Sequence, residues 1–167
     1  MLAVLPSTTR NAFAIGEAQR IGIPCLLTGT RFLDLGLPTV CEDGRLSAAA
    51  AVARLAQQGH RRIGIAHRPD SAPWVFQRRE GFMQGLADAG IEPDERMICW
   101  MPGIYDEQAW ADQLQQYVER QRPTALVLSS GMLCRPLGEV MRRTGLQIPR
   151  DLSVIGFDQV YTCLLYT

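Results

Sequence analysis

The sequence predicts an α/β fold in which parallel sheets are flanked by helices on both faces. Short apolar runs alternate with amphipathic stretches along the chain, which is the pattern of repeated strand–helix units. The apolar runs lack alternating polar residues, as expected of strands buried on both sides. With 47% hydrophobic and 20% charged residues in 167, the chain has the composition of a globular protein that buries a sizeable core.

In the first half of the chain, three apolar runs predict strands and two amphipathic stretches predict helices. The first helix is expected to end at Gly22 and the second, which is rich in alanine, at Gly59, because glycine readily adopts the left-handed conformation that follows a helix. The expected strands cover residues 2–5, 24–27 and 39–41, and the expected helices cover residues 11–21 and 44–58.

The second half repeats the same alternation. Phe82 and Leu86 lie four residues apart on one face of an expected helix, which Gly90 ends. Asp106 is expected to cap the next helix, and Pro136 is tolerated in the first turn of the last one. The expected strands cover residues 63–66, 97–100, 125–128 and 153–157, and the expected helices cover residues 75–89, 106–121 and 135–143.

Charge and hydropathy exclude several classes of protein. Lysine plus arginine number 17, as do aspartate plus glutamate, so the chain lacks the basic surface of a nucleic-acid-binding domain. No apolar run reaches the roughly 18 residues that a membrane-spanning helix needs. The N-terminal apolar run is too short, and has no basic start, for a signal peptide. We therefore expect no membrane contact, and DNA contact only through a segment outside this chain.

The cysteines and histidines indicate neither a metal site nor an enzyme. There is no C-x-x-C pair and no histidine cluster, which disfavours zinc and a disulfide framework, so no cofactor is expected. The chain has no G-x-S-x-G, G-x-x-x-x-G-K-[ST] or G-x-G-x-x-G motif, and so no catalytic constellation. His60 is expected to make a structural hydrogen bond, and Arg61 and Arg62 to complement helix dipoles. The cysteines, expected to be buried and reduced, are Cys25, Cys41, Cys99, Cys134 and Cys163.

Polar and aromatic residues gather after the expected strands. In parallel sheets, ligands bind beyond the carboxyl ends of the strands. Carboxylates accept, and arginine donates, paired hydrogen bonds to vicinal hydroxyls, while an aromatic face covers the apolar side of a ring. The residues of this kind are Asp43, Trp74, Arg78, Tyr105 and Asp158. Together they favour a site for a polyhydroxylated small molecule.

Structural alternatives for these residues remain open at this stage. Asp158 could cap a turn. Arg78 could lie with Arg79 on a solvated helix face, and Trp74 and Tyr105 could be half-buried loop aromatics.

Five motifs occur in the order found in one protein family. They are Val40-x-x-Asp43, Gly59-His60-Arg61-Arg62-Ile63, Arg78-x-x-Gly81-Phe82 with Ala89-Gly90-Ile91, Pro123-Thr124-Ala125, and Gly145-Leu146-x-Ile148-Pro149-x-Asp151-Leu152-Ser153-Val154-Ile155-Gly156-Phe157-Asp158. By this ordered set, residues 2–159 resemble the effector-binding core of lactose-repressor-type (LacI/GalR) transcription regulators.

The resemblance implies a periplasmic-binding-protein-like fold of two subdomains, both incomplete here, with an effector in the cleft between them. Residues 1–60 would be the later part of the N-terminal subdomain, and residues 61–161 most of the C-terminal one. The implied protein is a cytoplasmic homodimer in which a sugar, a sugar acid or a similar molecule controls operator binding by a missing headpiece. Two alternatives are a periplasmic sugar-binding protein of the same fold and a regulator with a different DNA-binding head.

The resemblance also implies roles for single residues. Asp43, Arg78 and Asp158 match the polar effector contacts of the family. Tyr105 falls where the family often has a stacking aromatic residue, and Trp74 lies in the loop that usually lines the cleft.

Two departures from the family pattern make the expected cleft less polar than a typical sugar site. The pair 132–133 is Met-Leu, where the family usually has Asn-Asp. The pair 29–30 is Gly-Thr, where many members have Asp-Arg.

The chain is expected to be truncated at both ends, because the family has further elements before residue 2 and after Asp158. Residues 162–167 are predicted to be a non-native tail. Their last five residues, Cys163–Thr167, can be back-translated into a transposon-end adaptor of sequencing libraries. A native variant terminus is the alternative, and raw reads would decide between the two.

A sheet interrupted in this way leaves strand edges unpaired and an apolar face uncovered. We therefore expect the isolated 167-residue chain to aggregate or to be partly molten. Size-exclusion chromatography and a thermal melt test this expectation. A sharp, cooperative transition of a soluble monomer would contradict it.

Overall fold

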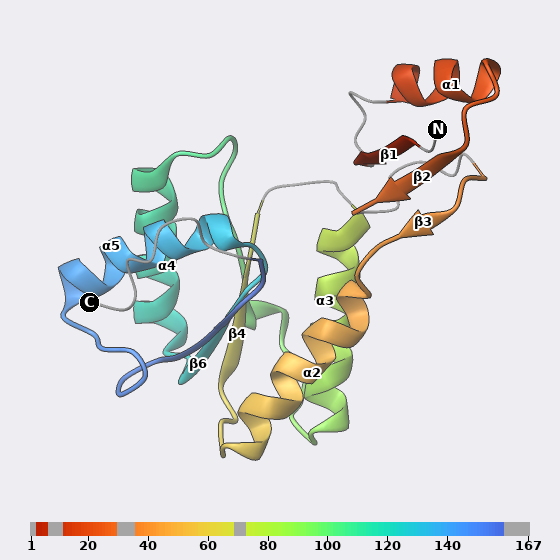
Figure 1. Ribbon diagram of the computed structural model, residues 1–167. Helices are drawn as coiled ribbons and strands as arrows, with labels where there is room; N and C mark the ends of the chain where they lie inside the picture. Colours follow the sequence, from red (N-terminus) through yellow and green to blue (C-terminus); the bar gives the residue numbers. More distant parts are fainter. Residues whose placement is uncertain (1–2, 7–11, 30–35, 69–72, 159–167) are drawn as a thin grey trace.

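Two parallel sheets organise the computed structural model, which describes residues 3–6, 12–29, 36–68 and 73–158 (Figure 1). The first sheet has the order β1-β2-β3, with β1 at Ala3–Pro6, β2 at Cys25–Thr28 and β3 at Thr39–Val40. The second has the order β5-β4-β6-β7, with β4 at Ile63–His67, β5 at Ile98–Trp100, β6 at Ala125–Leu128 and β7 at Ser153–Gly156. Every pairing is parallel, so the predicted α/β class is confirmed.

The helices are those expected from the sequence, with shifted ends. They are α1 (Ala12–Arg20), α2 (Gly44–Gln57), α3 (Pro73–Asp88), α4 (Glu107–Gln121) and α5 (Cys134–Thr144). Two short 3-10 turns, η2 (Glu95–Met97) and η3 (Gly131–Leu133), were not expected. Two boundaries matter for the site. β4 runs on to His67, and α3 begins early enough to place Trp74 in its first turn instead of a loop.

The core of the second sheet follows from strand alternation. Along β6, Ala125 and Val127 face α2 and α3, and Leu126 and Leu128 face α4 and α5. Both faces are therefore covered, which explains why this strand carries no polar residue. The largest fully buried side chain is Trp110 of α4, and burying such a residue contributes about 2–3 kcal/mol.

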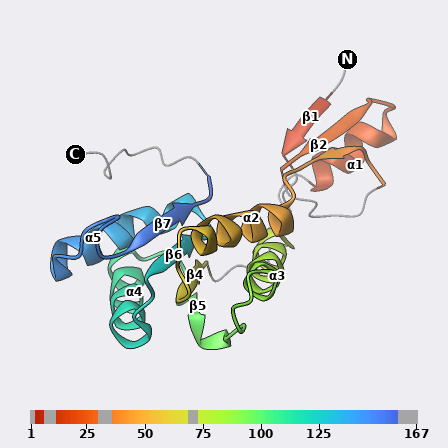
Figure 2. The ribbon, with the colours of Figure 1, turned by 90° about the horizontal axis from the view of Figure 1, so that it is seen from below.

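Helix α2 connects the two sheets. It starts next to β3 and runs along the second sheet beside α3 (Figures 1 and 2). The two helices approach closely at glycines of α3. A Cβ added at Gly81 would lie 2.0 Å from the carbonyl oxygen of Arg45, and one at Gly85 would lie 2.9 Å from Cβ of Val52. Glycine is needed at these positions because the backbone of α2 occupies the space of a side chain.

The helix ends follow the sequence signals. Gly59 has φ +92° after α2, and the amides of Gly59 and His60 donate to the carbonyls of Ala56 and Leu55, which is a Schellman arrangement. The structural role predicted for His60 is confirmed by the contact of its Nδ1 with Thr124 Oγ1 at 3.0 Å.

Arg61 and Arg62 serve two different helices. Arg61 donates to the carbonyl oxygen of Ala56 near the C-terminus of α2, at 3.0 Å. Arg62 donates to the carbonyl oxygens of Gln121 and Arg122 at the C-terminus of α4. The predicted complement to helix dipoles is thus confirmed, and Arg62 acts on a helix that is distant in sequence.

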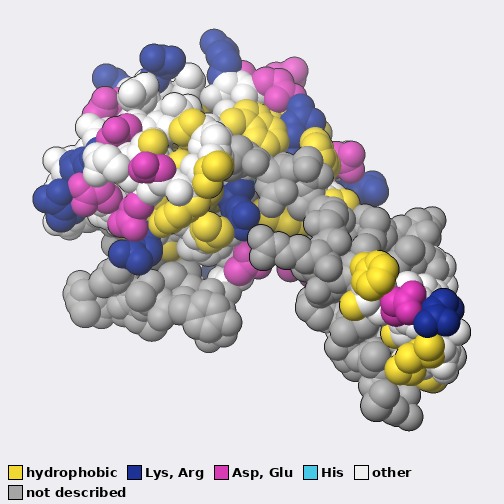
Figure 3. Space-filling model, turned by 90° about the horizontal axis from the view of Figure 1, so that it is seen from above, with side chains coloured by type: hydrophobic (Ala, Val, Ile, Leu, Met, Phe, Trp, Pro, Cys, Tyr) yellow, Lys and Arg dark blue, Asp and Glu magenta, His cyan; other side chains and the backbone are white. Residues whose placement is uncertain are grey.

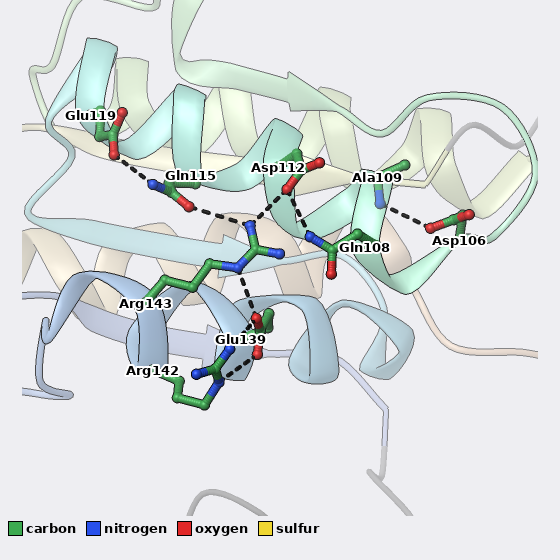
Figure 4. Close-up of polar contacts among 9 residues, drawn as sticks. All are labelled: Asp106, Gln108, Ala109, Asp112, Gln115, Glu119, Glu139, Arg142 and Arg143. Carbon is green, nitrogen blue, oxygen red and sulfur yellow. Dashed lines mark hydrogen bonds and ion pairs between the residues drawn. The ribbon is translucent and has the colours of Figure 1, made fainter.

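A surface network joins α4 to α5 (Figure 4). Arg143 donates to Asp112 of α4 at 2.6 Å and to Glu139 at 2.8 Å, and Arg142 also donates to Glu139. These two arginines lower the pKa of Glu139 to about 2. Asp106 caps α4, as predicted, by accepting from the amide of Ala109 at 2.9 Å.

Three of the four described cysteines are buried, as predicted. Cys25, Cys99 and Cys134 are buried, and burial raises the pKa of Cys99 to about 12. Cys41 is exposed, which corrects the expectation for that residue, because β3 ends at Val40 and leaves Cys41 in the open segment before α2. Cys163 lies outside the described residues. Within the described ranges, no cluster of His, Cys, Asp or Glu suits a metal ion, and no helix is long and apolar enough to cross a membrane.

The close approach of α2 and α3 makes Gly81 sensitive to substitution. We expect Gly81→Ala to lower the free energy of unfolding by about 1–3 kcal/mol, because its methyl group collides with the backbone of α2. Chemical denaturation measures the change. The matched control is Gly138→Ala in α5, where an added Cβ meets nothing within 4 Å. There the loss of glycine flexibility should instead stabilise the protein by roughly 0.5–1 kcal/mol. Equal effects of the two substitutions would contradict the packing argument.

Candidate ligand-binding cleft

A cavity of about 630 Å³ opens where the carboxyl ends of strands from both sheets meet. Its walls come from the ends of β2, β3, β4, β6 and β7 and from the first turns of α3, and its lining residues are Gly29, Val40, Cys41, Glu42, Arg68, Trp74, Arg78, Ser130 and Asp158. Seen from above, hydrophobic and arginine side chains lie next to one another on this face of the molecule (Figure 3). The expectation that a site would form beyond the strand ends agrees with this position.

Arg78 is the centre of the cavity wall. Its side chain is 4% exposed. Nη1 donates to the carbonyl oxygen of Ser129, and Nη2 donates to Glu42 and, at 3.4 Å, to Oδ1 of Asp158. A buried guanidinium is tolerated only where such partners replace water.

Two aromatic rings lie against the same guanidinium. Its central carbon is 4.8 Å from the ring centroid of Trp74 and 4.2 Å from that of Phe157. Both contacts are within the range of cation–π attraction. Carboxylate and carbonyl oxygens therefore hold the terminal nitrogen atoms of Arg78, and aromatic rings contact its guanidinium. A side chain held in one position in this way suits a binding site.

The backbone around Arg78 explains its position. Gly81, one turn further along α3, lets this helix approach α2, and Glu42 stands just before α2 begins. Asp158 follows β7 with φ +68°, a left-handed conformation that aspartate tolerates better than most residues. The turn carries its carboxylate back toward α3.

Three of the five predicted site residues are brought together at the cavity: Trp74, Arg78 and Asp158. Asp43 does not line it. Its carboxylate caps α2 by accepting from the amide of Leu46 at 2.9 Å, and it borders a neighbouring depression of about 600 Å³. Tyr105 does not line the cavity either, and its ring meets Trp110 edge-on, with centroids 4.9 Å apart. Direct ligand contact by any of the five stays a prediction.

Glu42 is the residue that sequence reasoning missed. It directly precedes the motif position Asp43, and the motif drew attention to Asp43 alone. The cap explains the difference. Since Asp43 turns back to the helix amides, Glu42 is left to reach Arg78. An acid directly before a helix cap, at the end of a strand, was the available signal.

The described residues of the two departures from the family pattern lie at or near this cavity, and residue 30 is outside the described residues. Gly29 lines it, and Ser130 lines it just before the Met-Leu pair. Met132 is 38% exposed, and Leu133 is fully buried in the core. The pair at 132–133 thus supplies no carboxylate to the cleft.

His67 lies at the end of β4, below this face of the sheet. It is fully buried and stacks on Trp100 with centroids 4.9 Å apart. Among the described residues, neither ring nitrogen has a hydrogen-bond partner. Burial, helped by the positive charges of Arg79 and Arg78, lowers the pKa of His67 to about 4. The ring is therefore neutral at physiological pH, and it adds no charge beside Arg78.

Comparison with known proteins agrees with this architecture. A family described as "periplasmic binding protein-like domain" matches residues 52–166. The chain belongs to this family. It is 34% identical over 145 residues to the "HTH-type transcriptional repressor CytR" of Escherichia coli K12, an alignment that covers 86% of this chain and 42% of that protein. It is 30% identical over 119 residues to the "HTH-type transcriptional regulator GalR" of the same strain, covering 71% and 34%.

Solved structures of transcription regulators share the fold of this chain. A regulatory protein of the LacI family from Chloroflexus aggregans superimposes with a TM-score of 0.78 at 24% identity, covering 96% of this chain and 57% of that one. A complex of the transcriptional regulator CelR with cellobiose gives a TM-score of 0.69 at 25% identity, covering 92% and 47%. The resemblance to LacI/GalR effector-binding cores is thereby confirmed. The chain is a periplasmic-binding-protein-like domain, its named relatives are transcription regulators, and it spans under half the length of these curated relatives.

The buried neutral state of His67 makes stability depend on pH. The pKa of His67 in the folded protein, about 4, lies below the ordinary histidine value of 6.5. Above pH 6.5 the ring is neutral in both the folded and the unfolded chain, so it causes no pH dependence of stability. As pH falls toward about 4, the unfolded chain takes up the proton first, and the free energy of unfolding decreases. The full decrease in the free energy of unfolding is roughly 3 kcal/mol.

We expect His67→Phe, which keeps a ring to stack on Trp100, to remove this part of the acid sensitivity. Urea denaturation of both proteins between about pH 4 and pH 7 measures it. The free energy of unfolding of wild type should fall, relative to that of the variant, by roughly 3 kcal/mol between pH 7 and pH 4. Parallel pH curves would contradict a depressed pKa at His67.

Proposed function

We propose that this chain is the sensor part of a DNA-binding transcription regulator, and that a small-molecule effector binds in the cleft around Arg78. One observation carries the proposal. The cavity joins residues from the first sheet and the segment after it, such as Gly29 and Glu42, to Arg78 and Asp158 of the second part. A ligand in this position would contact both parts at once.

Such contacts supply a mechanism for control. If the two parts change their relative orientation, the distances from Glu42 to Arg78 and Asp158 change with it. An effector that binds better to one orientation shifts the population toward it. The coupling then equals the difference in effector affinity between the two orientations. Operator binding would follow, because the spacing of two headpieces in a dimer has to match two half-sites.

The DNA-binding part of this proposal rests on the relatives. CytR and GalR are named HTH-type regulators, and this chain covers less than half of each. The balanced charge of the chain itself offers no DNA-binding surface. We therefore propose that a headpiece outside this chain contacts the operator, in a cytoplasmic homodimer. The periplasmic sugar-binding alternative gains no support from these relatives.

We propose specific roles within the cleft. Arg78 and Asp158 would bind hydroxyl groups of a sugar-like effector, and the ring of Trp74 would cover its apolar side. Asp43 would act mainly by fixing the segment that carries Glu42. Tyr105 could reach the effector only if the segment after β5 moved toward the cavity.

The division at residue 60 is likewise a proposal. It separates a first subdomain, residues 1–60, from a second, residues 61–161, and treats 162–167 as a tail. Helix α2 precedes the division in the chain and packs on the second sheet. This helix would therefore transmit any change in orientation between the two parts.

Arg78 provides the direct test. We expect Arg78→Ala to abolish the effector response of the full-length gene product while operator affinity changes less than about twofold. Loss of charge-assisted hydrogen bonds should weaken effector binding by at least about tenfold. Operator binding titrations with and without effector measure both quantities.

Two further variants make the result decisive. Arg78→Lys keeps the charge but loses the paired donors, so it should weaken the response without leaving Glu42 and Asp158 unpaired. Arg79→Ala removes the neighbouring arginine, which pairs with Glu95 at the surface, and should leave the response intact. A normal response in both Arg78 variants would show that the cleft is elsewhere.

The sequence of the source locus tests the larger context. A helix-turn-helix encoded upstream would support the regulator. A signal peptide in its place would favour a transport-binding protein.

A further inference from the structure

Glu42 contacts the central arginine from a different part of the molecule. It stands between β3 of the first sheet and helix α2, whereas Arg78 belongs to α3. Its side chain is 48% exposed, so solvent and ligands can reach it, while the Arg78 side chain is 4% exposed. Glu42 therefore meets an incoming ligand before Arg78 does.

In Arg78, both hydrogens of Nη2 and one of Nη1 are occupied, which leaves one Nη1 hydrogen for a single hydroxyl group but no adjacent pair of donors for an anion. A guanidinium has five N–H donors. Nη1 already serves the Ser129 carbonyl, and Nη2 serves the carboxylates of Glu42 and Asp158. Nε is buried without a partner among the described residues, and Trp74 and Phe157 lie against the guanidinium. The paired approach that a carboxylate or phosphate makes to arginine is thus taken by the protein's own acids.

The charged side chains that line the cavity add up to no net charge. Its charged residues are Glu42, Asp158, Arg68 and Arg78, two of each sign. Arg68 lies 5.7 Å from the ring centroid of Trp74 and is itself engaged in interactions. An anion entering the cavity would lose its hydration and meet two carboxylates, which is costly without new partners.

The remaining lining suits an uncharged molecule. Glu42 and Asp158 each keep carboxylate lone pairs that can accept from hydroxyl groups. Ser130 adds a hydroxyl, and Val40 (62% exposed) and Trp74 offer apolar surface. Hydroxyls on one side and an apolar face on the other match this distribution.

We propose that Glu42 sets the charge selectivity of the cleft, and that the effector is an uncharged, hydroxylated molecule and not a sugar acid or a phosphorylated sugar. The second half of this statement rests on the proposed function, because it takes the cleft as the effector site. The first half concerns anion exclusion alone. It can be tested without knowing the effector or the operator.

Inorganic phosphate is the probe, titrated by calorimetry into the full-length gene product near pH 7 at constant ionic strength. We expect no binding to the wild-type protein up to about 10 mM phosphate. Glu42→Gln, which keeps the shape of the side chain, should bind phosphate at least about tenfold more tightly, because it removes a charge from the path to Arg78. Glu92→Gln, an equal charge change at an exposed position after α3, should behave like wild type.

Each result decides the proposal. Phosphate binding by wild type would overturn anion exclusion. Absence of binding by Glu42→Gln would show that Glu42 is not the residue responsible, and an equal gain in Glu92→Gln would reduce the effect to net charge. Failure of the operator tests on Arg78, combined with a gain in Glu42→Gln, would reject the proposed function while leaving the charge selectivity in place.

Discussion

A charged guanidinium buried where two sheets meet is the constraint on which this site depends. Arg78 cannot remain there without compensation, because an unpaired charge in such a place costs several kcal/mol. The chain compensates from three directions, with Glu42 before α2, the Ser129 carbonyl after β6 and Asp158 after β7. Elements that are far apart in sequence are thereby held to one point, and the cavity forms around it.

The same constraint gives the packing of α2 and α3 a functional meaning. Gly81 and Gly85 let the two helices approach closely, and the approach brings Glu42 within reach of Arg78. A wider separation would leave the arginine with the Ser129 carbonyl and, at 3.4 Å, the carboxylate of Asp158. Core packing therefore determines the site geometry in this domain, because the glycines that let the helices approach also bring the charged side chains together.

Charge balance at the cleft depends on Glu42 and on the neutral residues around it. Glu42 adds an acid at the entrance, while Met132 and Leu133 stand where a polar pair is usual in the family. His67 contributes no charge, because burial keeps it neutral. The lining has equal numbers of acidic and basic residues. Apolar contacts and hydrogen bonds to hydroxyl groups therefore contribute more to ligand selectivity than net charge does.

The sequence by itself determined the α/β class, the order of the elements and most helix ends. These depend on local signals: aliphatic runs for strands, and Gly59, Gly90 and Asp106 at helix ends. It also identified three residues that meet at the cavity, Trp74, Arg78 and Asp158, since strand ends in parallel sheets converge.

Only the tertiary structure showed that Asp43 and Glu42 have different partners. Adjacent carboxylates look alike in sequence, but one turns toward the helix amides and the other reaches an arginine 36 residues away. It likewise placed Tyr105 against Trp110 and not at the cavity. Which side chains share a space depends on how helices pack and loops turn, and these long-range distances have no local signature in the chain.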